Sequence, residues 1–117
     1  MIDKQRVHML LSRYIGIREC SPNGMYPDPE GDFWIPMTEE LTKNEDETIA
    51  LLNELEPKEF LYTLEVLEDI TEKLKSKKLL DTVRKIGIKN GIYNDYKKGI
   101  YKDYLDNRIR AATFYLD

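Results

Sequence analysis

Few side chains in this sequence could carry acid–base, nucleophilic or metal chemistry. The chain has one histidine, His8, and one cysteine, Cys20. General acid–base catalysis usually needs a histidine or carboxylate in a shielded pocket, and a nucleophilic cysteine needs an adjacent base. No such partner can be assigned, and no glycine-rich phosphate loop, HExxH or GxSxG motif occurs. We therefore expect a protein that is not an enzyme, with no catalytic residue, no cofactor and no metal site.

One segment has the spacing of acids found in calcium-binding loops. Positions 1, 3, 5 and 12 of this stretch are Asp28, Glu30, Asp32 and Glu39. The sharp turn of such a loop needs glycine where this sequence has Phe33, and Pro29 and Pro36 restrict the backbone. Calcium binding is therefore not expected.

The carboxylates are segregated along the chain. Residues 28–72 contain fifteen acids and two bases, a net charge of −13, whereas residues 73–117 have a net charge of +7. Such segregation creates a dipolar surface field, which affects partners and association rates more than the fold. The acids expected to bind a partner are Glu65, Glu68, Asp69 and Glu72 on one helical face, helped by Glu47 and Glu54 of the preceding helix. A solvated helix face is the alternative explanation.

Aromatic residues lie in a second candidate region. Residues 20–37 contain four of the five prolines together with glycine, so we expect a long loop there. Loops of this length in compact domains are usually functional or fixed by their own side chains. If the acidic face is not the partner interface, we expect Tyr26, Phe33 and Trp34 to be the aromatic anchors of that interface.

The C-terminal segment favours a different function. It interleaves tyrosines with bases, namely Tyr93, Tyr96, Tyr101 and Tyr104 with Lys97, Lys98, Lys102, Arg108 and Arg110. Bases beside aromatic rings are typical of nucleic-acid contacts, although tyrosines at helical spacing also form core stripes. A small nucleic-acid-binding accessory protein is therefore the alternative function, together with a non-catalytic subunit of a larger assembly.

Apolar periodicity predicts the helices that must position these side chains. The clearest spans Pro57–Ser76, with a core stripe formed by Phe60, Leu64, Leu67, Ile70 and Leu74. Further helices are expected over residues 2–18, 44–56 and 77–89, and one or two within residues 91–117. The expected fold class is all-α, a compact bundle of about five helices with one long Pro/Gly-rich loop, in a single domain over residues 1–117.

Length and composition agree with one soluble domain. The chain has 117 residues, a common single-domain size, of which 41% are hydrophobic and 34% charged. No apolar run approaches the roughly 20 residues that cross a membrane, and the first residues lack the pattern of a secretion signal. Because a single cysteine excludes an internal disulfide framework, we expect a cytoplasmic protein.

Residues 56–86, EPKEFLYTLEVLEDITEKLKSKKLLDTVRKI, carry a resemblance to a known family. An acidic run leading into EVLEDI, then a basic turn with Ser76 and a following LL, resembles small helical immunity proteins encoded beside bacterial polymorphic and contact-dependent growth-inhibition toxins. The resemblance covers about a quarter of the chain. It implies a cytoplasmic, non-catalytic protein whose partner is the C-terminal domain of a cognate toxin, often a nuclease.

The charge pattern agrees with that implication. A nuclease presents a cationic groove to its substrate, so an inhibitor with a block of net charge −13 would be steered toward it. The inhibitor would either cover the active site or bind beside it. Direct nucleic-acid or membrane contact is not expected, because the acidic block repels phosphates.

Overall fold

The structure is a computed structural model that describes residues 1–20, 29–93 and 96–116, without the side chains of Cys20 and residues 29–32. Every regular element in these ranges is a helix, so the all-α prediction is confirmed. Since α4, η1 and α5 run on continuously, the described ranges contain six helices and the separate 3₁₀ segment η2, close to the predicted five. None of these helices is long and apolar enough to cross a membrane.

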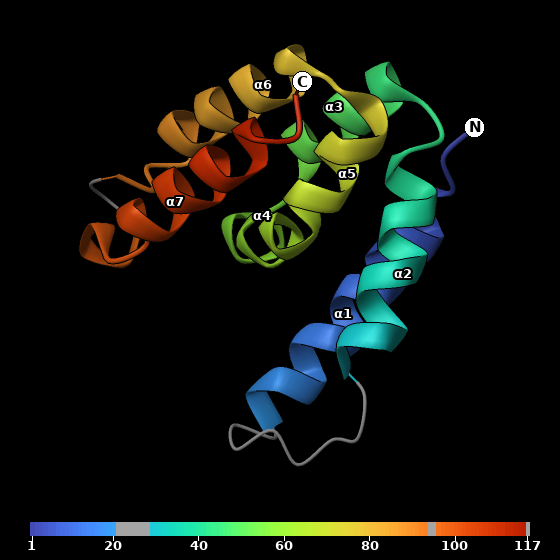
Figure 1. Cartoon of the computed structure of the whole chain (residues 1–117). Coiled ribbons are helices and arrows are strands. Elements are labelled where there is room, and N and C mark those ends of the chain that lie inside the picture. Colours follow the sequence, from blue (N-terminus) through green and yellow to red (C-terminus); the bar gives the residue numbers. More distant parts are fainter. Residues whose placement is uncertain (21–28, 94–95, 117) are drawn as a thin grey trace.

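The helices α1 (Lys4–Cys20) and α2 (Pro29–Leu41) form an antiparallel pair at one end of the molecule (Figure 1). The prediction of a loop through residue 37 is wrong for residues 29–37, which belong to α2; residues 21–28 lie outside the described ranges. Phe33, Met37 and Leu41 are buried and stand four residues apart, so one helical face enters the core. This burial outweighs the loss of a backbone hydrogen bond at Pro36, inside the helix.

The start of α3 (Glu45–Glu54) is set by a side-chain cap. Asn44 Oδ1 accepts a hydrogen bond from the backbone N–H of Glu47 at 2.9 Å, as its position in the sequence predicts. Leu51, Leu52 and the following Leu55 are buried, which turns the apolar side of α3 toward the core. The predicted helix over residues 44–56 is therefore confirmed to within two residues at its end.

The predicted single helix over Pro57–Ser76 is bent. It consists of α4 (Pro57–Thr63), the 3₁₀ turn η1 (Leu64–Val66) and α5 (Leu67–Leu74). Thr63 Oγ1 donates to the Glu59 carbonyl at 2.8 Å just before the turn, a bond that bends helices. The bend buries consecutive side chains on more than one face of the segment, because Thr63, Leu64, Val66 and Leu67 are all buried.

The C-terminal half is built on α6 (Lys77–Lys89), η2 (Tyr96–Gly99) and α7 (Lys102–Thr113). Ser76 Oγ caps α6 by accepting from the backbone N–H of Leu79 at 2.9 Å. Helices α6 and α7 lie side by side, and α4 and α5 lie between this pair and the α1–α2 pair (Figure 1). The bent segment therefore packs centrally, and one hydrophobic cluster draws on all seven α-helical segments.

Two glycines form a matched test of this packing. A Cβ on Gly16 of α1 would meet open space, whereas a Cβ on Gly87 of α6 would overlap Cδ2 of the buried Leu105 on α7. Alanine in an exposed helix interior stabilises by about 0.5–1 kcal/mol relative to glycine. We expect Gly16→Ala to raise the free energy of unfolding by this amount and Gly87→Ala to lower it by roughly 1–3 kcal/mol through overpacking.

Urea denaturation of the two variants measures both changes. The Gly16 variant is the control for helix propensity, which the two substitutions share. Equal stabilisation by both alanines would contradict the close contact between α6 and α7.

Candidate functional site

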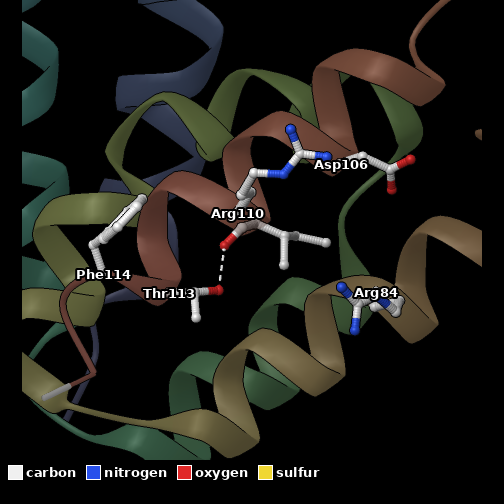
Figure 2. A pocket seen from close by; sticks show the side chains of 6 residues that line it. Arg84, Asp106, Arg110, Thr113 and Phe114 are labelled. Atoms are coloured by element: carbon white, nitrogen blue, oxygen red, sulfur yellow. Dashed lines mark hydrogen bonds between the residues drawn. The ribbon is translucent and has the colours of Figure 1, made fainter.

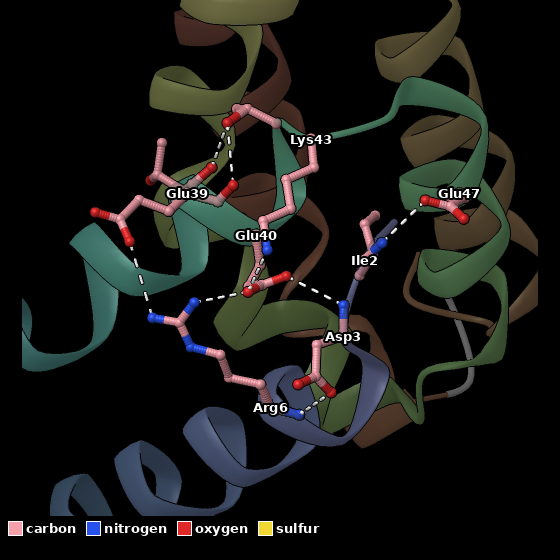
Figure 3. A network of polar contacts seen from close by, with 9 residues as sticks. Ile2, Asp3, Arg6, Glu39, Glu40, Lys43 and Glu47 are labelled. Carbon is pink, nitrogen blue, oxygen red and sulfur yellow. Dashed lines mark hydrogen bonds and ion pairs between the residues drawn. The ribbon is translucent and has the colours of Figure 1, made fainter.

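A buried carboxylate fixes the N-terminus of the chain to α2 (Figure 3). Glu40 is 1% exposed, and its Oε1 accepts hydrogen bonds from Arg6 Nη1 at 2.6 Å and Lys43 Nζ at 2.9 Å. Its Oε2 accepts from the backbone N–H of Asp3 at 3.1 Å. The hydrogen bond from Lys43 is the largest cause that lowers the pKa of Glu40 to about 2, against the opposing effect of burial. Glu40 is therefore a structural anion and not part of a free acidic surface.

Two of the acids predicted to bind a partner hold α3 against the N-terminal residues. Glu47 Oε2 accepts from the backbone N–H of Ile2 at 3.0 Å, and Lys4 Nζ lies 3.2 Å from Glu54 Oε1. Figure 3 shows the first of these contacts beside the Glu40 network. Because the Lys4–Glu54 pair is half exposed, it contributes little to stability, but Glu47 satisfies a backbone donor at the chain terminus. Both carboxylates thus have internal partners.

Glu65 lies at the junction of three helices. Its Oε1 accepts a hydrogen bond from the buried Tyr14 hydroxyl at 2.8 Å and another from Trp34 Nε1 at 3.2 Å. Both donors are neutral, so these hydrogen bonds bring no positive charge to the carboxylate. Burial and the Glu65 hydrogen bond raise the pKa of the Tyr14 hydroxyl far above its ordinary range, which keeps it a proton donor at neutral pH.

The remaining acids of the predicted face lie on α5. Glu68 has Arg108 of α7 at 3.9 Å, the limit of an ion pair, while Asp69 and Glu72 are exposed and make no hydrogen bond or ion pair with any described residue. Leu67 and Ile70, on the opposite side of α5, are buried. We name the acids Glu65, Glu68, Asp69 and Glu72 the acidic strip. It runs along the outer side of η1 and α5, and its charge is least compensated at Asp69 and Glu72.

The aromatic anchors predicted in the loop have different positions. Phe33 is 1% exposed and stacks on Tyr14 with ring centroids 4.1 Å apart, so it is a core residue unable to contact a partner. Trp34 is 37% exposed, and its bond to Glu65 places it beside the acidic strip. Tyr26 lies outside the described residues. The structure therefore brings together two parts of the predicted interface that are distant in sequence, Trp34 and Glu65.

His8 lies beside a carboxylate of α4. His8 Nδ1 lies 3.3 Å from Glu59 Oε2 on the exposed side of α1, and the side chain of Cys20 lies outside the described atoms. Residues 29–39 of the segment compared with a calcium loop are helical. Within the described ranges, no group of three or more histidine, cysteine or acidic side chains could hold a metal ion.

A tyrosine-lined pocket was not predicted from the sequence. It has a volume of about 450 Å³ and lies where α1, α4, η1, η2 and α7 meet. Four rings line it, those of Tyr62, Tyr96, Tyr101 and Tyr104. Burial raises the pKa values of the Tyr62 and Tyr104 hydroxyls, so both stay protonated. The spacing of Tyr96, Tyr101 and Tyr104 indicated a core stripe, but only the fold brings Tyr62 and Glu65 to these rings.

A second pocket, of about 550 Å³, lies between α6 and α7 (Figure 2). Arg84 of α6 faces Asp106 and Arg110 of α7 across it, and Phe114 at the end of α7 is 82% exposed. Asp106 also accepts a hydrogen bond from Tyr93 at 2.8 Å. In the C-terminal segment Lys97, Lys98, Lys102 and Arg110 are exposed and Arg108 is half-buried, while its tyrosines are partly buried against the core.

Comparisons with known proteins identify no relative, since no protein-family model, curated protein or solved structure matches the chain. The candidate site is therefore described by its own geometry. It consists of the acidic strip, the exposed edge of Trp34 and the adjoining tyrosine pocket, and it combines uncompensated negative charge with aromatic surface. Such a combination is suited to binding a cationic partner.

The Glu40 network predicts an acid-dependent loss of stability. The folded-state pKa of about 2 lies below the model-compound value of 4.5, so the stabilisation is complete above about pH 4.5 and is lost as the pH falls toward 2. Glu40→Gln should lower the free energy of unfolding at pH 7 by roughly 1–3 kcal/mol, and this deficit should shrink over the same pH window.

Urea denaturation between pH 7 and pH 2.5 measures the deficit. Glu39→Gln is the matched control. Glu39 is 58% exposed, and its ion pair with Arg6, at 3.8 Å, is longer and weaker than the pair that Glu40 forms. A deficit that is the same at every pH would show that Glu40 acts through packing and not through its charge.

Proposed function

We propose that this protein is a non-catalytic, cytoplasmic immunity protein that binds and neutralises a cognate bacterial toxin domain through the acidic strip and Trp34. The observation that carries the proposal is the hydrogen bond from Trp34 Nε1 to Glu65 Oε1 at 3.2 Å. It joins an exposed tryptophan, the kind of residue that dominates binding energy in interfaces, to a row of carboxylates. The resemblance of residues 56–86 to immunity proteins covers this strip.

The charge of the strip suits a nuclease partner. A nuclease carries lysines and arginines where it contacts phosphate, and carboxylates at matching positions speed association and exclude wrong partners. Asp69 and Glu72 are available for this role because no described side chain neutralises them. Their mutual repulsion at a spacing of three residues is a small internal cost that a bound cation relieves.

A growth assay tests the proposed function. A candidate toxin domain from a neighbouring gene is expressed from an inducible promoter with this protein, without it, or with the Trp34→Ala variant. We expect growth to be restored by the wild-type protein and restored less by Trp34→Ala, because a central tryptophan typically contributes 2 kcal/mol or more, roughly 30-fold in affinity. An unrelated toxin domain is the control, and equal protection against both toxins argues against specific neutralisation.

The acidic strip has its own prediction. The double variant Asp69→Lys and Glu72→Lys should slow association with the toxin domain by about 10-fold at low salt, and the difference should shrink as ionic strength rises and shortens the Debye length of about 8 Å. The melting temperature should stay the same or rise slightly, since the lysines that replace Asp69 and Glu72 stand four residues after Glu65 and Glu68, a spacing that favours opposite charges. Surface plasmon resonance at two salt concentrations measures the rates.

Asp81→Lys is the matched control for the double variant. Asp81 is an exposed acid on α6 without a partner among the described residues, so its reversal changes the net charge by two but leaves the strip intact. The double variant changes the net charge by four, so a slowing by Asp81→Lys of about half that of the double variant on a logarithmic scale would indicate a response to total charge. Unchanged association by the double variant would remove α5 from the interface.

A second function is favoured by the pocket between α6 and α7. Arg84 and Arg110 flank it beside the exposed ring of Phe114, an arrangement that can contact phosphates and stack on a base. Asp106 in the same pocket opposes phosphate binding. Fluorescence anisotropy with single-stranded RNA at two salt concentrations distinguishes this accessory-protein function: salt-sensitive binding lost in Arg84→Gln and Arg110→Gln would support it, and no binding at low salt would exclude it.

A further inference from the structure

We infer that the tyrosine pocket accepts the guanidinium group of an arginine side chain, stacked against its rings and paired with Glu65. The inference rests on the proposed function in one respect only, that the arginine belongs to the toxin domain. Its physical basis is the geometry of the pocket, which has a volume of about 450 Å³, within the range of about 300–1,000 Å³ found for ligand sites.

The rings of the pocket are held in place by contacts with other side chains of the protein. Tyr62 packs edge-on against the buried Tyr14 with centroids 5.9 Å apart, and Tyr96 and Tyr101 lie 6.0 Å apart at an angle of 35°. All three rings are partly buried against the core. Preformed aromatic faces cost little conformational entropy on binding, so a planar cation can be stacked without reorganising the site.

Glu65 provides the carboxylate. Its two hydrogen bonds come from neutral donors to Oε1, and no described residue donates to Oε2 or forms an ion pair with it. Oε2 is therefore available to accept a hydrogen bond from a guest. A partner guanidinium supplies a donor for Oε2 and a positive charge, and its planar form suits a carboxylate and a ring face at once.

The other charges of the pocket define the orientation of the guest. Glu19 is already paired with Lys58, whose ammonium lies 3.1 and 3.2 Å from its two oxygens. Arg108 sits over Tyr104 at 5.1 Å, which is an internal example of a guanidinium against one of these rings. Lys97 is exposed at the margin and repels a cation. The guest therefore approaches Glu65 from the side of Tyr62 and Tyr96.

The test uses small probes and does not depend on a toxin. N-acetyl-arginine amide and its neutral isostere N-acetyl-citrulline amide are titrated into the isotope-labelled protein, and the ring resonances of Tyr62, Tyr96 and Tyr101 are followed by NMR. We expect saturable shifts with arginine, with a Kd on the order of 10 mM, and at least about 5-fold weaker binding of citrulline. Equal shifts with both probes, or no shift with arginine, would overturn the inference.

Two variants assign the charges. Glu65→Gln keeps the acceptor for Tyr14 and Trp34 but removes the negative charge, so it should weaken arginine binding by about 5-fold or more with an otherwise native spectrum. Lys97→Gln removes the repelling charge and should strengthen arginine binding by about 2-fold, whereas a site for anions would respond in the opposite direction. Shifts confined to residues around Asp69 and Glu72 would place the cation on the open strip and overturn the pocket assignment.

The two proposals fail separately. Arginine binding in the pocket without protection from the toxin would leave the pocket established and the immunity function rejected. Protection from the toxin without arginine binding would retain the immunity function and reject the pocket as its anchor.

Discussion

The side chain of Tyr14 connects the N-terminal helix pair to the rest of the molecule. Its ring stacks on Phe33 of α2 with an angle of 3° between the planes, lies perpendicular to the ring of Tyr62 of α4, and its hydroxyl donates to Glu65 of η1. Because the side chain is only 2% exposed, its hydroxyl needs an acceptor, and Glu65 supplies one. The same carboxylate accepts from Trp34, so the position of the exposed tryptophan follows from the burial of a tyrosine. The candidate interface is thus coupled to the core.

The net charge of the acidic block is a poor guide to the field outside the molecule. Many of its carboxylates are used internally, where they hold the N-terminus, cap helices or pair with lysines: Glu40, Glu45, Asp46, Glu47, Glu54 and Glu59. The ion pairs of Glu40, Asp46 and Glu54 with basic side chains lower the charge that a partner senses. Glu45, Glu47 and Glu59 accept hydrogen bonds from neutral donors, which fix these carboxylates without compensating their charge. On α5, Asp69 and Glu72 are exposed and have no basic partner among the residues that the structure describes.

Sequence periodicity predicted the helices whose caps and apolar stripes are local, and it failed where distant contacts decide. Asn44 and Ser76 cap their helices as expected because each bonds to a backbone group three residues away. Helix α2 was not predicted because its prolines favoured a loop, although Phe33 and Met37 have helical spacing. That spacing stabilises a helix only when α1 covers the face on which these two side chains lie. The bend at η1 was not predicted either. A threonine inside a helix can bond back to a carbonyl of the preceding turn, and the sequence alone does not show whether the helix bends there.

In the candidate site, too, the features that depend on local spacing could be predicted and those that depend on distant contacts could not. The acids of α5 share a face through helical geometry, and their grouping follows from spacing alone. The partners of Glu65, by contrast, come from positions 51 and 31 residues away in the chain. Those partners give the strip two kinds of carboxylate. Asp69 and Glu72 are solvated and free to attract a partner over a distance, whereas Glu65 is fixed by hydrogen bonds and desolvated on one side. Charges of the first kind mainly set the rate of encounter with a partner, and a fixed, partly desolvated charge mainly sets the rate of dissociation. In the proposed complex, the bend that separates Glu65 from α5 would therefore separate these two roles.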